Sequence, residues 1–212
     1  MNELFLWIAS WNDNFFQKTQ FLYSLPIHLQ NEILKYKFES DQNQSLVSKI
    51  LIKKMLKKWG YDFEDLHYCP NQKPYLHHPN SPPYFSYSKS KEKVALAWSW
   101  DIEVGVDIEY LYRQPEWKIF QSRLSPSVWS KIIHEENPSL TFLKCWTHIE
   151  AILKLKAVGL ANHIGLVNYS ENENEWFFKD EKIYIQNLEH HKHFITLACY
   201  KPFQLNMEEI TL

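Results

Sequence analysis

The sequence predicts an α+β protein, and two similar lobes of about 100 residues each are a reasonable arrangement for it. Three observations lead to this prediction. Apolar residues recur at helical spacing in two separate regions, and strand-length runs of apolar residues flank them. The resulting order is strand, helices, paired strands, helices, strands. A chain of 212 residues can also bury one sizeable core or two small packed lobes.

The first half is expected to begin with a strand and continue with helices. Residues 1–8 are mostly apolar, but the run contains Glu3, has no basic segment before it and is too short to span a membrane. We therefore expect a cytoplasmic protein. Helical periodicity extends from Pro26 to Trp59, with an apolar stripe and lysines around it. The stripe consists of Leu46, Ile50, Leu51 and Met55.

A β-hairpin is predicted near the middle of the chain. Its strands would be Lys93–Trp98 and Val104–Glu109, joined by a turn from Ser99 to Glu103. Such a hairpin would lie where the two halves of the chain meet.

The second half is expected to contain two helices followed by strands. One helix is predicted over 126–136, and a second begins at Pro138 and continues to about Leu155. Short strands are predicted over 175–178, 182–185 and 194–200.

Composition narrows the classes of partner and compartment. The formal net charge is −2, so no overall positive field attracts nucleic acid or an anionic membrane, and any anion must be bound locally. Cys69, Cys145 and Cys199 are odd in number and widely spaced, which is typical of reduced thiols in the cytosol.

Three carboxylates form a candidate metal site. On a strand, Asp107 and Glu109 point to the same side while Ile108 points to the other. Adjacent carboxylates repel each other unless a cation such as Mg²⁺ lies between them. Glu150 is the third candidate ligand because it interrupts an otherwise apolar helix, and Lys154 follows it at i+4. A surface ion pair is the commoner explanation of such a spacing taken alone.

The sequence contains an internal comparison for this site. The triplet Asp101-Ile102-Glu103 repeats Asp107-Ile108-Glu109 but falls in the predicted turn, where acidic side chains are solvated. His190, His191 and His193 could suggest zinc, yet no cysteine or carboxylate lies nearby at a zinc-finger spacing. A polar turn that enters a strand is the preferred interpretation.

Four ordered segments together resemble the 4′-phosphopantetheinyl transferases, specifically the larger monomeric type that activates surfactin synthetase. Residues 105–109 resemble the family's Gly-x-Asp-x-Glu segment, and residues 146–154 resemble its Trp-Ser/Thr-x-Lys-Glu-Ala-x-x-Lys helix. Upstream, residues 72–76 resemble Gly-Lys-Pro-Tyr-Leu and residues 85–90 resemble Phe-Asn-x-Ser-His-Ser. The resemblance covers nearly the whole chain.

This resemblance implies a pseudo-dimer of two α+β lobes, 1–103 and 104–212, with the active site in the cleft between them. The implied enzyme is a cytoplasmic monomer that transfers the phosphopantetheine arm of coenzyme A to a serine of an acyl or peptidyl carrier protein. Nucleic acid and membrane are not implied partners.

The resemblance also implies a role for individual residues. Mg²⁺ would be held by Asp107, Glu109 and Glu150. Glu150 would also act as the base for the acceptor serine, and Lys154 would stabilise charge on the phosphate. The implied contacts with coenzyme A are made by Lys73, Ser88, Lys89, Lys154 and Ser45.

The chain departs from the family pattern at several positions. Lys89 replaces a histidine, Ile149 replaces a lysine, and Gln44 stands where an arginine often occurs. Residues 157–160 match the Gly-x-Gly-Leu turn only partly. A non-catalytic module that binds coenzyme A or a nucleotide is therefore one alternative, and a Mg²⁺-dependent phosphohydrolase or nuclease is another.

A segment after the acidic triplet suggests how the carrier would dock. The carrier proteins that the resembled family modifies are commonly acidic around the modified serine, and in that family the corresponding segment contacts them. Residues 110–120 mix aromatic with basic side chains, a composition suited to such a surface. We expect Arg113, Trp117 and Phe120 to contribute to this surface.

Overall fold

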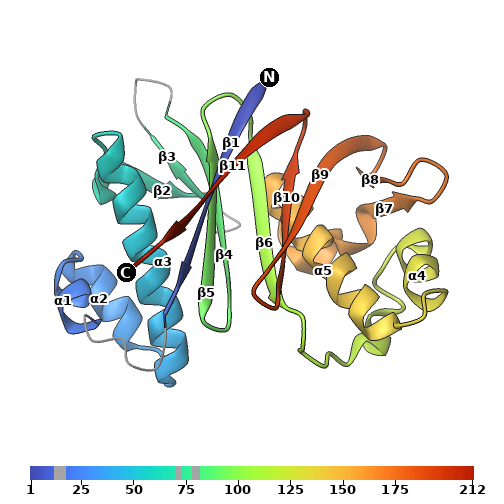
Figure 1. The fold of residues 1–212 in the computed structure, drawn as a ribbon, viewed down its shortest axis with the longest axis horizontal. Helices are drawn as coiled ribbons and strands as arrows, with labels where there is room; N and C mark the ends of the chain where they lie inside the picture. Colours follow the sequence, from blue (N-terminus) through green and yellow to red (C-terminus); the bar gives the residue numbers. More distant parts are fainter. Residues whose placement is uncertain (12–17, 70–72, 78–81) are drawn as a thin grey trace.

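Two β-sheets packed against each other form the centre of the protein, and helices cover both outer sides (Figure 1). The computed structural model describes residues 1–11, 18–69, 73–77 and 82–212. Neighbouring strands of the two main sheets are antiparallel except for one pair. The protein is therefore α+β, which confirms the predicted class.

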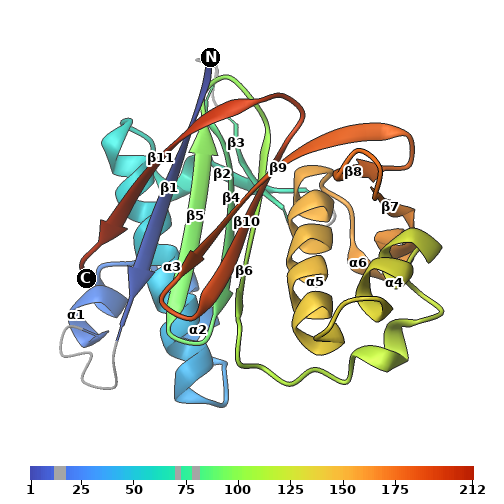
Figure 2. The same ribbon diagram turned by 45° about the vertical axis from the view of Figure 1, so that its right-hand side comes forward.

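The first sheet has the strand order β11-β1-β5-β4. Its strands are β1 (Asn2–Ser10), β4 (Tyr84–Ser90), β5 (Lys93–Ser99) and β11 (Phe203–Ile210). Figure 2 shows β11, the last strand of the chain, beside β1, with which it forms the parallel pair. The second half of the chain thus gives its final strand to the sheet of the first half.

The second sheet has the order β6-β10-β9-β8-β7. Its strands are β6 (Val104–Tyr110), β7 (Val167–Ser170), β8 (Glu175–Phe178), β9 (Glu181–His190) and β10 (His193–Cys199). A separate pair consists of β2 (Leu66–Tyr68) and β3 (Pro74–Leu76).

The helices divide between the two outer faces (Figure 1). The first sheet carries α1 (Lys18–Tyr23), α2 (Ile27–Leu34) and α3 (Glu39–Lys58). The second carries α4 (Pro126–Ile133), α5 (Pro138–Leu155) and the short α6 (Leu160–His163). The predicted helix from Pro138 to about Leu155 is confirmed. No helix in the described residues is both long and apolar enough to cross a membrane.

Side-chain alternation along the strands builds separate apolar layers. From β1, Leu4, Leu6 and Ile8 enter the core between the sheets, whereas Trp7 and Ala9 pack toward α3. The corresponding inter-sheet residues of β6 are Val104, Val106 and Ile108. The opposite face of β6 is therefore left for Gly105, Asp107 and Glu109.

The predicted hairpin between Lys93–Trp98 and Val104–Glu109 is wrong. Both strands exist, but β5 pairs with β1 and β4, while β6 pairs with β10 in the other sheet. The loop between them therefore carries the chain from one sheet to the next. Strand periodicity identifies a strand but not its partner, which in this case lies far away in the sequence.

Candidate functional site

The site begins at the line where β4 of the first sheet faces β6 of the second. Serines occupy alternate positions on β4, so their hydroxyls point the same way. The Ser86 Oγ accepts a hydrogen bond from the Val106 amide at 3.2 Å, and the Ser90 Oγ accepts one from the Tyr110 amide at 3.1 Å. These hydroxyls satisfy amides on the edge of β6 that no strand pairs with, and they tie the two sheets together.

Asp107 lies at the centre of this line and is only 2 % exposed. Its Oδ1 accepts a hydrogen bond from the Ser88 hydroxyl at 2.7 Å and another from the Lys154 ammonium at 2.6 Å. Its Oδ2 is buried and has no hydrogen-bond partner among the residues that the structure describes. A buried carboxylate oxygen without a partner is costly, so this atom is a natural ligand for a cation.

Glu109 lies two residues along the same face of β6. Its carboxylate accepts a hydrogen bond from the Ser90 hydroxyl at 3.1 Å and pairs with the Arg113 guanidinium at 2.9 Å. Burial, together with the nearby Asp107 carboxylate, raises the pKa of Glu109. The carboxylates of β6 thus repel each other, as expected from their spacing.

Helix α5 packs directly on this face of β6 because position 105 has no side chain. A Cβ atom on Gly105 would lie 2.0 Å from the Ala151 carbonyl oxygen and 2.5 Å from the Leu155 amide nitrogen. Only glycine allows so close an approach between the strand and the helix backbone.

The two ends of α5 are held by specific contacts. At its start the Asn137 side chain accepts a hydrogen bond from the Leu140 amide at 3.2 Å. At its end the Val158 amide donates to the Leu153 carbonyl and the Ala157 amide to the Lys154 carbonyl, which is a Schellman motif.

Lys73 adds a further bond at the end of α5. Its ammonium donates to the Leu155 carbonyl at 3.2 Å and to the Val104 carbonyl at 3.4 Å. Burial lowers the pKa of Lys73. Lys73, which directly precedes β3, therefore bonds to the backbone of both α5 and β6.

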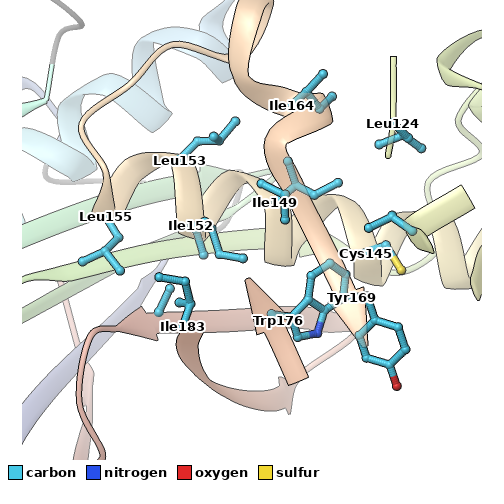
Figure 3. Close-up of a cluster of buried hydrophobic side chains, with 14 of the residues drawn as sticks. Leu124, Cys145, Ile149, Ile152, Leu153, Leu155, Ile164, Tyr169, Trp176 and Ile183 are labelled. Atoms are coloured by element: carbon cyan, nitrogen blue, oxygen red, sulfur yellow. The ribbon is translucent and has the colours of Figure 1, made fainter. Parts of the chain in front are cut away.

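The sides of α5 have different roles. Ile149 is only 1 % exposed and lies in the apolar core of the second half with Cys145 and Ile152 (Figure 3). A side chain at position 149 points away from the cleft. An isoleucine at this position, where the resembled pattern has a lysine, therefore leaves the charged groups of the cleft unaltered.

Glu150 and Lys154 lie on the other side of α5, with Nζ of Lys154 3.8 Å from a carboxylate oxygen of Glu150. Burial, together with the Asp107 carboxylate, raises the pKa of Glu150 to about 7, with a smaller contribution from Glu109. Burial opposes the charge of Lys154, but Asp107 and Glu150 outweigh it and raise the pKa of Lys154. The negative charges of both β6 carboxylates thus disfavour ionisation of Glu150.

In this structure the Lys154 ammonium is the cation that lies between Asp107 and Glu150. The ligand oxygens of these three carboxylates, all of which the structure describes, do not lie within 4.8 Å of one another, so they do not form a closely preorganised cage. The donor set still suits Mg²⁺, which takes a few carboxylate oxygens and fills its other positions with water and phosphate.

A cleft of about 280 Å³ borders this group of charges. Lys73, Lys89 and Lys154 all line it, together with Tyr87 and Ser88. A second hollow of about 500 Å³ lies on the other side of Lys89. Its lining residues are Gln44, Lys89, Ser90, Lys91, Glu109, Tyr110, Tyr112 and Arg113.

Lys89 therefore borders both hollows. Burial, together with the neighbouring Lys49 ammonium, lowers the pKa of Lys89. An ammonium that is partly dehydrated and near another cation is suited to bind a phosphate group.

Ser45 lies apart from the other predicted residues. It is buried on α3, where its hydroxyl accepts a hydrogen bond from the Lys49 ammonium at 3.4 Å, and Lys49 also pairs with Glu32. Ser45 does not line the cleft or the second hollow. Gln72, the first residue of the upstream motif, lies outside the described residues.

The three residues predicted to dock a carrier protein, Arg113, Trp117 and Phe120, all make contacts within the protein itself. Trp117 stacks obliquely with Trp129, and Phe120 packs on Phe142 in the core of the second half. Arg113 is tied to Glu109. These contacts give all three residues a structural role that composition did not reveal.

Sequence reasoning missed Ser86 and Ser90, which bond to β6. Their signal was the serine repeat at alternate positions from 86 to 90, which is the spacing of a single strand face.

The geometry defines an α+β protein with a cluster of carboxylates and lysines where β4, β6 and α5 meet. No protein-family model matches the chain, and a comparison with curated proteins also gives no match.

Proposed function

We propose that this protein is a 4′-phosphopantetheinyl transferase that uses Mg²⁺ and coenzyme A to modify a serine of an acyl or peptidyl carrier protein. The enzyme would be a cytoplasmic monomer. Its two lobes, 1–103 and 104–212, would form a pseudo-dimer, with β11 of the second lobe added to the first. The basis is the resemblance of the four motifs together with the geometry of the cleft.

The observation that carries the proposal is the environment of Asp107. One carboxylate oxygen is held by Ser88 and Lys154, and the other is buried without a partner in the described part of the chain. A purely structural ion pair does not require an oxygen without a partner. A metal-binding site does require one, because the bound ion offsets the unfavourable free energy of burying that oxygen.

Asp107, Glu109 and Glu150 would hold Mg²⁺ once Lys154 moves from between them toward the cleft. The metal would supply positive charge against the pyrophosphate of coenzyme A. Lys154 and Lys89 would then bind phosphate oxygens on the side of the cleft that they line.

The remaining predicted contacts differ in how directly they would act. Ser88 and Lys73 border the cleft and would contact the nucleotide end of coenzyme A. Ser45 would act through its neighbour Lys49, because its hydroxyl already bonds to that ammonium.

The proposed reaction is a phosphoryl transfer without a covalent enzyme intermediate. The carrier's serine oxygen attacks the β-phosphorus of coenzyme A, forming the new P–O bond. The bond from that phosphorus to the oxygen bridging to the α-phosphate breaks, and adenosine 3′,5′-bisphosphate leaves. Glu150 would accept the serine proton, directly or through a water molecule. Most of the work is positioning and charge stabilisation.

Intact-mass analysis of several apo-carrier proteins after incubation with the protein, coenzyme A and Mg²⁺ tests the proposal. The expected product is a carrier that is heavier by one phosphopantetheine group, and chelation of the metal should prevent its formation. Binding of coenzyme A without modification of any carrier would favour a non-catalytic module. Release of phosphate or cleavage of nucleic acid without a carrier would favour a hydrolase or nuclease.

A further inference from the structure

A second group of side chains that can bind a metal lies away from the cleft. It is found where the β9–β10 turn of the second sheet approaches β11 of the first. His190 is the last residue of β9, His191 begins the turn, and Glu209 comes from β11 of the other sheet. Glu209 Oε1 is 2.7 Å from His190 Nε2 and 3.9 Å from His191 Nε2. No single stretch of sequence contains this group.

The neighbouring His193 shows what a purely structural histidine looks like in the same turn. Its Nδ1 lies 3.0 Å from the His191 carbonyl oxygen and its Nε2 lies 3.2 Å from the Ser90 carbonyl oxygen. A backbone carbonyl oxygen therefore lies against each ring nitrogen, and the neutral imidazole donates its single N–H to one of them.

His190 and His191 differ from His193 in this respect. The Nδ1 of His190 is buried and has no hydrogen-bond partner within residues 1–11, 18–69, 73–77 and 82–212, and its other nitrogen faces Glu209. The ring of His191 makes no hydrogen bond with any residue that the structure describes. Two imidazoles thus converge on one carboxylate without backbone bonds that would hold them in place.

The donor set and spacing are close to those of a zinc site. Two imidazole nitrogens and one carboxylate oxygen are typical Zn²⁺ ligands, and a water molecule completes a tetrahedron. Ligand atoms about 2.0–2.1 Å from a tetrahedral ion lie roughly 3.4 Å from each other. The observed separations of 2.7 and 3.9 Å lie on either side of that value, so small side-chain rotations satisfy it.

We propose that His190, His191 and Glu209 form a binding site for Zn²⁺ or a similar transition-metal ion. Imidazole favours such ions over Mg²⁺, whereas the all-carboxylate group around Asp107 favours Mg²⁺. The bound ion joins the β9–β10 turn of the second sheet to β11 of the first. Its effect is to cross-link the two sheets, and none of its ligands belongs to the proposed transferase site.

Titration of the metal-free protein with Zn²⁺ in the presence of excess Mg²⁺ tests the site. Calorimetry measures the binding of Zn²⁺, and the visible absorption of a tetrahedral ion measures the binding of Co²⁺ in a parallel titration. One ion per chain is expected. Glu209→Gln and His191→Asn should each weaken binding at least about tenfold, since each removes a ligand. His28→Ala, which removes an exposed histidine of α2, should leave the affinity unchanged.

The variants are chosen so that the protein still folds. The side chains of His191 and Glu209 are 70 % and 61 % exposed, and asparagine tolerates the positive φ of 43° at position 191. Zn²⁺ should also raise the melting temperature of the natural protein but not that of His191→Asn. Equal affinity of all variants, or competition by Mg²⁺, would overturn the proposal while leaving the transferase proposal intact.

Discussion

The two sides of the central cleft differ in the chemistry that they supply. From the first sheet, β4 contributes hydroxyls and the Lys89 ammonium, whereas β6 and α5 contribute three carboxylates. Lys154 is the exception, because it comes from the acidic side and bonds to both Asp107 and Ser88. The second half therefore contains both charge types, but the serine hydroxyls and the Lys89 ammonium come from the first half, so the complete site depends on how the halves pack.

The acidic side should be the more sensitive to substitution. Asp107→Asn removes a buried charge that no neighbour can replace, and we expect the rate of carrier modification to fall by about 1000-fold. The matched control is Asp101→Asn, which alters the same position of the repeated triplet in an exposed loop. Initial rates by intact mass distinguish the two, and equal rates would rule out a special role for Asp107.

The contact between α5 and β6 should be the next most sensitive feature. In Gly105→Ala the new methyl group meets backbone atoms of α5 at 2.0 and 2.5 Å, so the helix must move or the protein unfold. We expect a loss of at least about 3 kcal/mol in the free energy of unfolding, measured by denaturant titration.

Gly60→Ala provides the comparison for this effect. Nothing lies within 4 Å of the new methyl group, and only the positive φ of 77° opposes it, so the expected loss is about 1 kcal/mol. A similar loss in both variants would show that close helix–strand packing is not the cause.

The burial of Glu150 and the repulsion from its neighbouring carboxylates should appear as a dependence of stability on pH in the metal-free protein. The pKa of Glu150 is raised from 4.5 to about 7, so its contribution is most favourable below 4.5 and is lost as the pH rises through about 7. Glu150→Gln should therefore be more stable than the natural protein at pH 8, by on the order of 1–3 kcal/mol, but not at pH 4.

Chemical unfolding at both pH values, with a chelator present, measures this difference. Repeating it with Mg²⁺ gives the control, because the metal should stabilise the natural protein and reduce the advantage of Glu150→Gln. A variant that is no more stable at pH 8 would mean that burial and the neighbouring carboxylates do not disfavour the charged form of Glu150.

The basic side should mainly affect binding of coenzyme A. Lys89→Ala removes an ammonium from the cleft, and we expect the KM for coenzyme A to rise about tenfold with a smaller change in kcat. Lys57→Ala, on the exposed side of α3, is the control and should change neither constant. A fall in kcat with an unchanged KM would assign Lys89 to the chemical step.

The smallest expected effect concerns the turn that ends α5. Ala157 has a φ of 51°, a conformation that favours glycine, so Ala157→Gly should stabilise the protein by about 1 kcal/mol. Ala161→Gly, within α6, should destabilise it by a similar amount. Thermal unfolding compares the two signs, and a loss of stability in Ala157→Gly would contradict the expectation.

Several features of the fold could be predicted from local sequence patterns. Helical periodicity and Pro138 marked the limits of α5, and the strand over 175–178 was predicted at its observed position. The hairpin was wrong because the partner of β6 is β10, and β4 was missed because its serines do not resemble a buried strand. Periodicity reports the backbone of one segment but contains no information about its neighbour.

The same distinction applies to the site. The period of a strand placed Asp107 and Glu109 on one face, and the period of a helix placed Glu150 near Lys154, so the sequence alone determined these pairs. Tertiary packing decided that Ser88 and Lys154 bond to Asp107, and that Glu209 reaches His190. Side-chain direction along one element follows from backbone geometry, whereas distances between elements depend on how the apolar faces of the whole chain pack together.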